Sequence, residues 1–358
     1  MKTTVLVARF EIHFNRFLDH EGKATQDFPD FASPKALIEL YSAMVLTRTF
    51  DAKAVALQRT GQLGTFASTL GQEAVGVGVA SAMQASDVLL PTYRESGAML
   101  LRGVKMEEIL GYWGGDERGS DYAGPRQDFP ICVPIATQAG HAVGVATAMK
   151  LRKEARAAVC MGGDGCTSKG DFYEAMNLAG AWKLPVVFFV ANNQWAISVP
   201  CRAQTATQTL AQKAIAAGIE GWQVDGNDVI AVRDAAERAL AKARSGKGAT
   251  LIEALTYRLH DHTTADDATR YRAAEEVEAA WELEPVKRLR TYLHNCSHWS
   301  KEQEERLVKE CAEKVQKSVE TYLAAPPPDP SHMFDHLYAT LPAALKSQRD
   351  AAVGKGSG

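Results

Sequence analysis

The chain has 358 residues, enough to bury a large hydrophobic core and long for one ordinary domain, although α/β folds of this size often form a single unit. It carries 40 Lys and Arg against 43 Asp and Glu, which leaves a formal net charge of −3. Since no stretch is dense in basic residues, we expect neither nucleic acid nor an anionic membrane as a partner.

Two further features bear on location. No segment approaches the roughly 18 uninterrupted apolar residues that a membrane-spanning helix needs, and the apolar run near the N-terminus is too short for a signal peptide. The six cysteines are scattered without a Cys-x-x-Cys pair, which suits a reducing compartment. We therefore expect a cytoplasmic protein with no membrane contact.

The N-terminal part predicts an arm and then a helix. Residues 1–33 have the composition of an irregular arm. Ser33 is a favourable N-cap and Pro34 a favourable first helical residue, so a helix should run from Lys35 to about Gly61. This helix opens the main α/β domain, which we expect to span residues 34–324.

The next informative segment is a short apolar run that ends before Tyr93 and Arg94. This run, residues 89–91, indicates a strand, so Arg94 should lie in a loop at a strand end. Its planar fork of donors suits a diphosphate, and such a charge-assisted contact contributes roughly 1.5 to 3 kcal/mol. An isolated arginine of this kind is more often part of a surface salt bridge.

Residues 134–138 precede an apolar helix that we expect over residues 140–150. Ile135, taken alone, would be a core residue. Gly140 and Gly144, four residues apart in this helix, allow close backbone packing, which suggests tight helix contacts between elements or subunits.

Gly163-Asp164-Gly165 is separated from Asn192-Asn193 by the twenty-six residues from Cys166 to Ala191. Apolar runs at 157–161 and 185–190 predict two buried strands, and residues 171–182 predict the helix between them. Both polar motifs then lie beyond the carboxyl ends of neighbouring parallel strands, where ligands bind in open sheets.

The chemistry of these two motifs favours a magnesium–diphosphate site. Mg²⁺ takes about six oxygen ligands and usually receives one or two from side chains, as Asp164 and Asn193 could supply. Glycines beside Asp164 would let backbone N–H groups approach a phosphate. A lone Gly-Asp-Gly is most often an ordinary turn, and it is the Asn-Asn partner at this spacing that favours the site.

Toward the C-terminus, residues 250–257 predict a late strand, followed by a polar loop over residues 260–272. Arg258, His260 and His262 lie within five residues at the start of this loop. Histidine titrates near neutral pH and can move protons, but loops of this kind often face solvent without a role.

The remaining residues predict a helical end. Residues 273–324 should form charged helices that complete the main domain. Residues 325–358 form the third predicted part: a stiff proline-rich linker to Pro330, a short helical end from Met333 to Leu345, and a loose glycine-rich tail.

Over roughly residues 35–345 the chain resembles the α subunit of the thiamine diphosphate-dependent decarboxylating component of bacterial 2-oxo acid dehydrogenase complexes, the pyruvate dehydrogenase and branched-chain 2-oxo acid dehydrogenase family. The segments that carry the resemblance are GQLGTFASTLGQEA, PTYRESGAMLLRG, GDGCTSKGDFYEAMNLAGAWKLPVVFFVANNQWAIS, VDGNDVIAV and TYRLHDHTTADDATRYR. The resemblance implies the thiamine diphosphate-binding fold, an α/β fold with a doubly wound, mostly parallel sheet and helices on both faces.

The resemblance also implies the site residues. The magnesium ligands would be Asp164, Asn193 and Trp195, and His262 would be the catalytic residue that assists acyl transfer, with His260 the weaker candidate. Ile135 would support the bent conformation of the cofactor, and Thr137 and Gln138 match residues that bind a monovalent cation in branched-chain members. The full set of cofactor-binding residues would be Tyr93, Arg94, Val133, Ile135, Gly163, Asp164, Gly165, Cys166, Asn193, Trp195, Arg258 and His262.

The implied reaction is oxidative decarboxylation of a 2-oxo acid, with transfer of the acyl group to the lipoyl group of a dihydrolipoamide acyltransferase. The α subunits of this family lack the carboxylate that activates thiamine diphosphate, so a β subunit would be needed, in an α2β2 heterotetramer. Residues 169–174 and the stretch from Leu210 favour pyruvate, whereas residues 134–138 and 224–229 favour a branched-chain 2-oxo acid; acetoin is the third alternative. A non-catalytic scaffold subunit is an alternative of another class, which the intact candidate residues disfavour.

Overall fold

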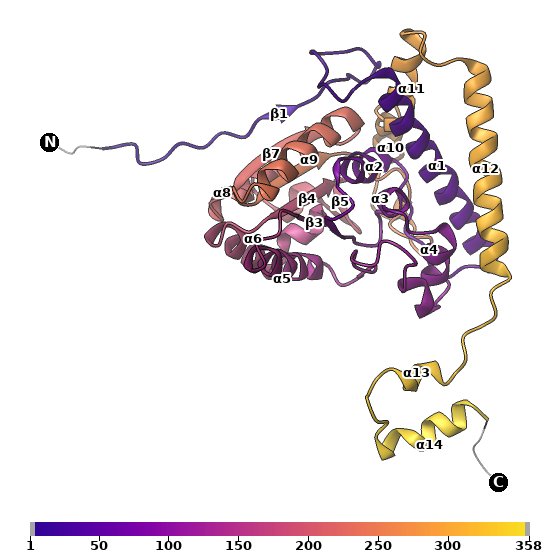
Figure 1. The fold of residues 1–358 in the computed structure, drawn as a ribbon. Coiled ribbons are helices and arrows are strands. Elements are labelled where there is room, and N and C mark those ends of the chain that lie inside the picture. The colour runs from indigo at the N-terminus through magenta and orange to yellow at the C-terminus, as the bar shows by residue number, and fades with distance from the viewer. Residues whose placement is uncertain (1–3, 355–358) are drawn as a thin grey trace.

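The computed structural model describes residues 4–354 and is built around a six-stranded parallel sheet (Figure 1). The strand order is β1-β7-β8-β4-β3-β2, and every neighbouring pair in it is parallel. The strands are β1 Phe14–Asn15, β2 Val88–Leu90, β3 Ala158–Gly163, β4 Val186–Asn192, β7 Glu220–Asp225 and β8 Thr250–Leu255, and a separate antiparallel hairpin pairs β5 Trp195–Ala196 with β6 Val199–Pro200.

Helices cover both faces of the sheet because successive strand residues point to opposite sides. Val159 and Met161 of β3 join the hydrophobic cluster that includes α2 and α9, whereas Ala158 and Cys160 join the cluster that includes α5 and α6. Figure 1 shows these two helix layers on either side of the sheet. The doubly wound α/β fold expected from the sequence is therefore confirmed.

The helix that the sequence predicted after Ser33 is present as α1. Ser33 accepts a hydrogen bond from Ala36 N (3.3 Å) and Pro34 is the first residue of α1, which confirms the expected helix start. The helices are α1 Pro34–Arg59, α2 Glu73–Ala82, α3 Ser96–Arg102, α4 Met106–Trp113, α5 Thr137–Leu151, α6 Gly170–Ala181, α7 Cys201–Gln204, α8 Lys213–Ala216, α9 Val229–Arg244, α10 Ala274–Trp281, α11 Pro285–Asn295 and α12 Lys301–Leu323, with 3₁₀ turns η1 Glu117–Ser120, η2 Asp164–Ser168, η3 Leu210–Gln212 and η4 Ala268–Arg270.

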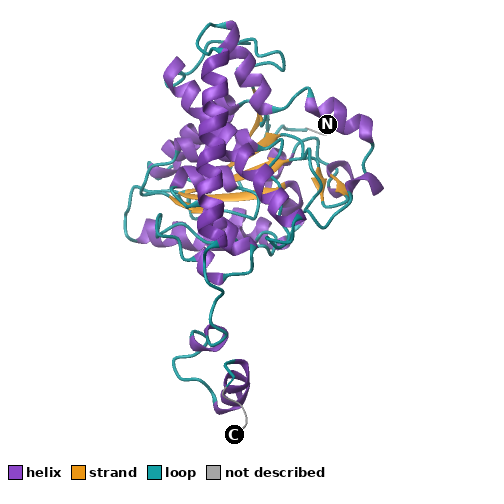
Figure 2. Ribbon diagram, turned by 90° about the vertical axis from the view of Figure 1, so that its right-hand side faces the viewer, coloured by secondary structure: helices purple, strands orange, loops and turns teal. Residues whose placement is uncertain are grey.

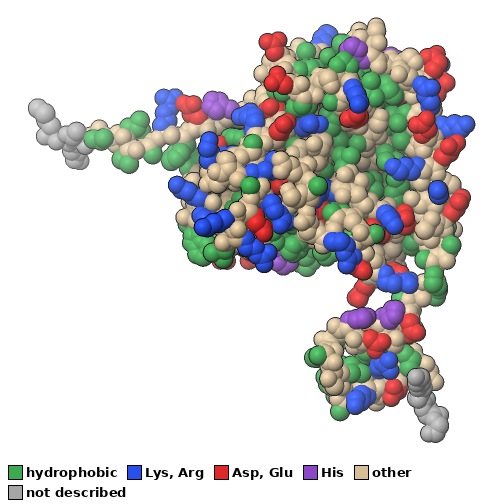
Figure 3. Space-filling view, viewed as in Figure 1, with side chains coloured by type: hydrophobic (Ala, Val, Ile, Leu, Met, Phe, Trp, Pro, Cys, Tyr) green, Lys and Arg blue, Asp and Glu red, His purple; other side chains and the backbone are tan. Residues whose placement is uncertain are grey.

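The N-terminal arm is not wholly irregular. Phe14 and Asn15 form β1, which pairs with β7 at one edge of the sheet. Asp228 fixes the following residues by accepting hydrogen bonds from Phe17 N (2.7 Å) and Leu18 N (2.8 Å). The outer part of the arm stands away from the body, with exposed apolar side chains (Figure 3).

The C-terminal end also differs from the expectation of a single short helix from Met333 to Leu345. Two helices form, α13 His332–Asp335 and α14 Ala343–Ala352, and they lie apart from the main body (Figures 1 and 2). Pro342 precedes α14, and a proline disfavours the helical conformation of the residue before it, so a helix through Leu341 is interrupted there. The three-part domain division of the chain stays a prediction.

Within residues 4–354 no helix combines the length and the apolar character needed to cross a membrane.

Candidate active site

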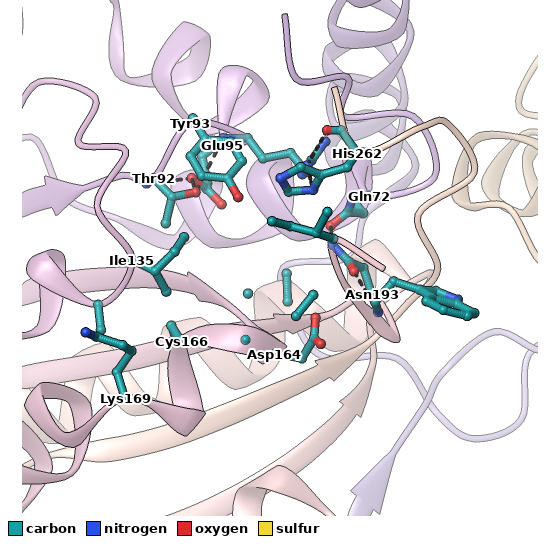
Figure 4. Close-up of a pocket in the computed structure, with 18 residues that line it drawn as sticks. Gln72, Thr92, Tyr93, Glu95, Ile135, Asp164, Cys166, Lys169, Asn193 and His262 are labelled. Carbon is teal, nitrogen blue, oxygen red and sulfur yellow. Dashed lines mark hydrogen bonds between the residues drawn. The ribbon is translucent and has the colours of Figure 1, made fainter. Parts of the chain in front are cut away.

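A cavity opens beyond the carboxyl ends of β3 and β4, at the edge of the sheet where the sequence predicted a site (Figure 4). Its empty volume is about 970 Å³, part of which is open to solvent. All but two of the predicted cofactor-binding residues line it: Tyr93, Arg94, Ile135, Gly163, Asp164, Gly165, Cys166, Asn193, Trp195 and His262.

Asp164 follows β3 directly and is 1% exposed. Its Oδ2 accepts a hydrogen bond from Gln204 Nε2 (2.6 Å). Burial raises the pKa of the Asp164 carboxyl, and the hydrogen bond from Gln204 opposes that effect. A carboxylate this buried gains from a cation that offsets its lost hydration.

Asn193 lies one residue beyond β4, on the same side of the cavity as Asp164 (Figure 4). Its Oδ1 accepts a hydrogen bond from Trp195 N (3.2 Å), and its Nδ2 donates to Gln72 Oε1 (3.0 Å). Trp195 offers no side-chain oxygen, so as a ligand it would use its main-chain oxygen, which here accepts from Arg258 Nη1 (3.1 Å).

No group of three or more His, Cys, Asp or Glu side chains in residues 4–354 is arranged to hold a metal ion. A cation bound by Asp164 would therefore need oxygens from amide, carbonyl, phosphate or water, which is the ligand set that Mg²⁺ commonly takes.

Two buried guanidinium groups lie on the opposite side, Arg94 in the cavity lining and Arg258 next to the lining residues Trp195 and His262. Arg94, in the loop after β2, donates to Ser68 O (2.5 Å) and His262 O (2.8 Å). Arg258 is completely buried and donates to Trp195 O, Ile197 O (2.9 Å) and Tyr271 Oη (2.9 Å). Within residues 4–354 neither arginine forms an ion pair with a carboxylate, so this side is suited to an anion.

A second observation supports an anion site. Gln72 Nε2 and Arg258 Nε are buried and have no hydrogen-bond partner in the described part of the chain. Gln72 lines the cavity, and an unpartnered buried donor costs free energy unless a ligand supplies an acceptor. The donors, the arginines and Asp164 together fit a diphosphate with its cation.

His262 lies between these arginines. Its Nδ1 is 3.3 Å from both Arg94 Nη2 and Arg258 Nη1. Since guanidinium groups only donate, Nδ1 must accept and the proton must lie on Nε2. Burial, then the charges of Arg94 and Arg258, lower the pKa of His262 to about 4, below the ordinary value that the sequence alone indicates.

Two predicted cofactor contacts lie outside the cavity lining. Val133 is 47% exposed, and Arg258 contacts the cavity only through His262 and Trp195. Ile135 does line the cavity and is 40% exposed, so its default assignment to the core does not hold. Gln138, predicted beside a monovalent cation, is buried at the start of α5 and donates from Nε2 to Cys132 O (2.5 Å).

Several lining residues were missed by reasoning from the sequence. Glu95 is buried and its Oε2 accepts from Thr92 N (2.7 Å) and Thr92 Oγ1 (2.6 Å). Glu95 directly follows Arg94 in the segment PTYRESGAMLLRG, and Gln72 lies in the segment GQLGTFASTLGQEA. Both segments carry the resemblance, and this was the signal that could have identified the two residues. Lys169 also lines the cavity, whereas nothing in the sequence connects Gln204 with Asp164.

Comparison with known proteins gives consistent matches. The family model described as dehydrogenase E1 component matches residues 41–331. The 3-methyl-2-oxobutanoate dehydrogenase subunit alpha of Mycobacterium tuberculosis strain H37Rv is 42% identical over 330 residues, covering 92% of this chain and 89% of that protein. The pyruvate dehydrogenase E1 component subunit alpha of Acholeplasma laidlawii is 40% identical over 335 residues (92% and 96%), and that of Bacillus subtilis is 36% identical over 337 residues (93% and 90%).

Proposed function

The chain belongs to the dehydrogenase E1 component family, and from this premise we propose that it is the α subunit of a pyruvate dehydrogenase that uses Mg²⁺ and thiamine diphosphate. One observation supports this proposal above others. A single cavity joins the buried carboxylate of Asp164 with the buried guanidinium of Arg94, and a second buried arginine, Arg258, lies next to the lining residues His262 and Trp195; neither arginine has a carboxylate partner among the described residues.

We assign the parts of the cavity as follows. Asp164 and Asn193, with Trp195 O as a third candidate, would hold Mg²⁺, and Arg94, Arg258 and Gln72 would hold the phosphates. When bound, thiamine diphosphate supplies the carbon nucleophile that attacks the 2-oxo acid and the electron sink for decarboxylation. The chain itself would bind the anionic end of the cofactor with these side chains.

The proposal extends to partners. A β subunit would complete the cleft and supply the activating carboxylate, in an α2β2 assembly, and a dihydrolipoamide acyltransferase would receive the acyl group. Thr137 and Gln138 remain candidates for a monovalent cation, and a cytoplasmic location stays a prediction.

We assign His262 to proton transfer. Burial is the largest cause of the lowered pKa of His262, and the charges of Arg94 and Arg258 come next; a diphosphate beside these arginines would offset their charges and so shift that pKa upward. The imidazole would then be able to deliver a proton to the lipoyl sulfur when the disulfide bond opens. Tyr93 packs edge-on against His262 with ring centroids 5.9 Å apart and would keep the ring oriented.

His262→Ala is expected to reduce lipoyl acylation more than decarboxylation, because only acyl transfer needs a proton at the departing sulfur. General acid catalysis typically contributes about 10² to 10⁴-fold, so acylation should fall by that order. Carbon dioxide release with an artificial electron acceptor and acylation of a lipoyl domain should be measured on the same variant. Equal losses in the two half-reactions would assign His262 to cofactor binding instead, and no loss would remove it from the site.

The most specific part of the proposal is the identity of the 2-oxo acid substrate. Pyruvate is favoured because several relatives are pyruvate dehydrogenase subunits, and the 3-methyl-2-oxobutanoate dehydrogenase relative supports a branched-chain substrate as the alternative. With the chain assembled with its β subunit, kcat/KM should be at least about tenfold higher for pyruvate than for 3-methyl-2-oxobutanoate, the scale on which pockets discriminate between apolar groups. The reverse order would identify the branched-chain enzyme, and turnover of acetoin alone would identify the third alternative.

A further inference from the structure

The segment from Cys201 to Lys213 contacts residues that support the two candidate cation ligands, Asp164 and Asn193. Gln204 reaches the Asp164 carboxylate. Ala211 N donates to Glu253 Oε2 (3.1 Å), and Glu253 Oε1 in turn accepts from Asn192 Nδ2 (2.7 Å), next to Asn193. This one segment therefore contacts Asp164 directly and, through Glu253, the Asn192 side chain next to Asn193.

Lys213 provides the firmest of these contacts. Its Nζ donates to Thr167 O (2.8 Å) and Thr167 Oγ1 (2.9 Å), and Thr167 Oγ1 donates to Asp164 O (2.8 Å). Lys213 is 6% exposed, its Nζ lies 5.5 Å from the centroid of the Tyr173 ring, and within residues 4–354 it forms no ion pair with a carboxylate. A buried ammonium group without a counter-ion is costly, so packing alone does not account for a lysine at this position.

Gln204 acts on the carboxylate itself. Its Nε2 donates to Asp164 Oδ2 at 2.6 Å and to Val199 O at 3.2 Å, which fixes the amide between the β5–β6 hairpin and the turn. Among the described residues no other residue donates a hydrogen bond to Oδ1 of Asp164, so Oδ1 is the freer of the two oxygens for a cation. The side chain is only partly buried, so its replacement should not disturb the core.

We propose that Gln204 and Lys213 are positioning residues that preassemble the cation site: Gln204 orients the Asp164 carboxylate, and Lys213 holds the Asp164–Thr167 turn through Thr167. This inference rests on the proposed magnesium role of Asp164. Residues that orient a metal ligand typically contribute 10- to 100-fold to metal affinity, and that is the contribution assigned to each of the two.

The test compares Gln204→Met and Lys213→Met with wild type, each assembled with its β subunit. Mg²⁺ is titrated calorimetrically in saturating thiamine diphosphate, and thermal unfolding and kcat at saturating Mg²⁺ are measured in parallel. Each variant should bind Mg²⁺ roughly 10- to 100-fold more weakly, with kcat largely recovered at saturation. Lys213→Gln, which keeps a donor without the charge, should recover part of the affinity.

Lys242 offers a control at another site. Its Nζ also donates to a carbonyl and a threonine hydroxyl, Ala249 O (2.9 Å) and Thr250 Oγ1 (3.1 Å), at the opposite end of the sheet strands, and unlike Lys213 it also forms an ion pair with Glu220 Oε1 (3.0 Å). Lys242→Met should leave Mg²⁺ affinity unchanged.

The outcomes separate this inference from the function it rests on. Wild-type Mg²⁺ affinity retained in both Gln204→Met and Lys213→Met would overturn the positioning role alone, as would an equal loss in Lys242→Met. Failure of the wild-type assembly to bind Mg²⁺ with thiamine diphosphate would overturn both. Should Lys213→Met fail to fold, Gln204→Met by itself still decides whether Gln204 orients the Asp164 carboxylate.

Discussion

Asp164→Ala is expected to abolish Mg²⁺-dependent binding of thiamine diphosphate while leaving the fold intact. The substitution removes the one carboxylate that lines the cation side of the cavity, and Asn193 alone supplies only a neutral oxygen. The fold should persist because the Asp164 carboxyl is buried at an unfavourable pKa and its loss removes a desolvation cost. Calorimetric titration of cofactor with and without Mg²⁺ measures the first effect, and thermal unfolding measures the second.

A charge-matched control separates the site effect from a general change in charge. Glu237 is an exposed acidic residue of α9, and Glu237→Ala removes one negative charge away from the cavity. It should bind cofactor as wild type does. Unchanged thiamine diphosphate affinity in Asp164→Ala would contradict the assignment of Asp164 to the metal.

The central part of the fold could be predicted because local and global signals agree there. The apolar runs that flank Gly163-Asp164-Gly165 are long enough to identify buried strands, and β3 and β4 pair in parallel with Gly163 opposite Ala191. That register places Asp164 and Asn193 at one edge, as expected. The neighbouring positions of two polar motifs followed from the general geometry of parallel sheets.

Features that depend on distant partners could not be predicted in this way. β1 has only two residues and exists because β7 presents an unpaired edge, which no local pattern of Phe14–Asn15 reveals. The break between α13 and α14 had a local signal in Pro342, since prolines interrupt helices.

The electrostatics of the site also depend on residues that are distant in sequence and so could not be predicted from local patterns. The pKa of His262 depends on burial and on Arg94, which is 168 residues away in sequence. The sequence alone indicates only the ordinary pKa of a histidine, because it does not show these neighbours. Gln204 likewise contacts Asp164 across 40 residues of sequence, from the end of the short helix α7, whose position the sequence pattern does not define.

The central claim is that this chain holds half of a thiamine diphosphate site and works only with a β subunit. The cavity is partly open to solvent at Ile135, where a partner could close it. The most direct test measures carbon dioxide release from pyruvate, with thiamine diphosphate, Mg²⁺ and an artificial electron acceptor, for this chain alone, the β subunit alone and the two together. We expect turnover only from the assembled pair, and only when Mg²⁺ and thiamine diphosphate are both present; turnover of pyruvate by this chain alone would contradict the account.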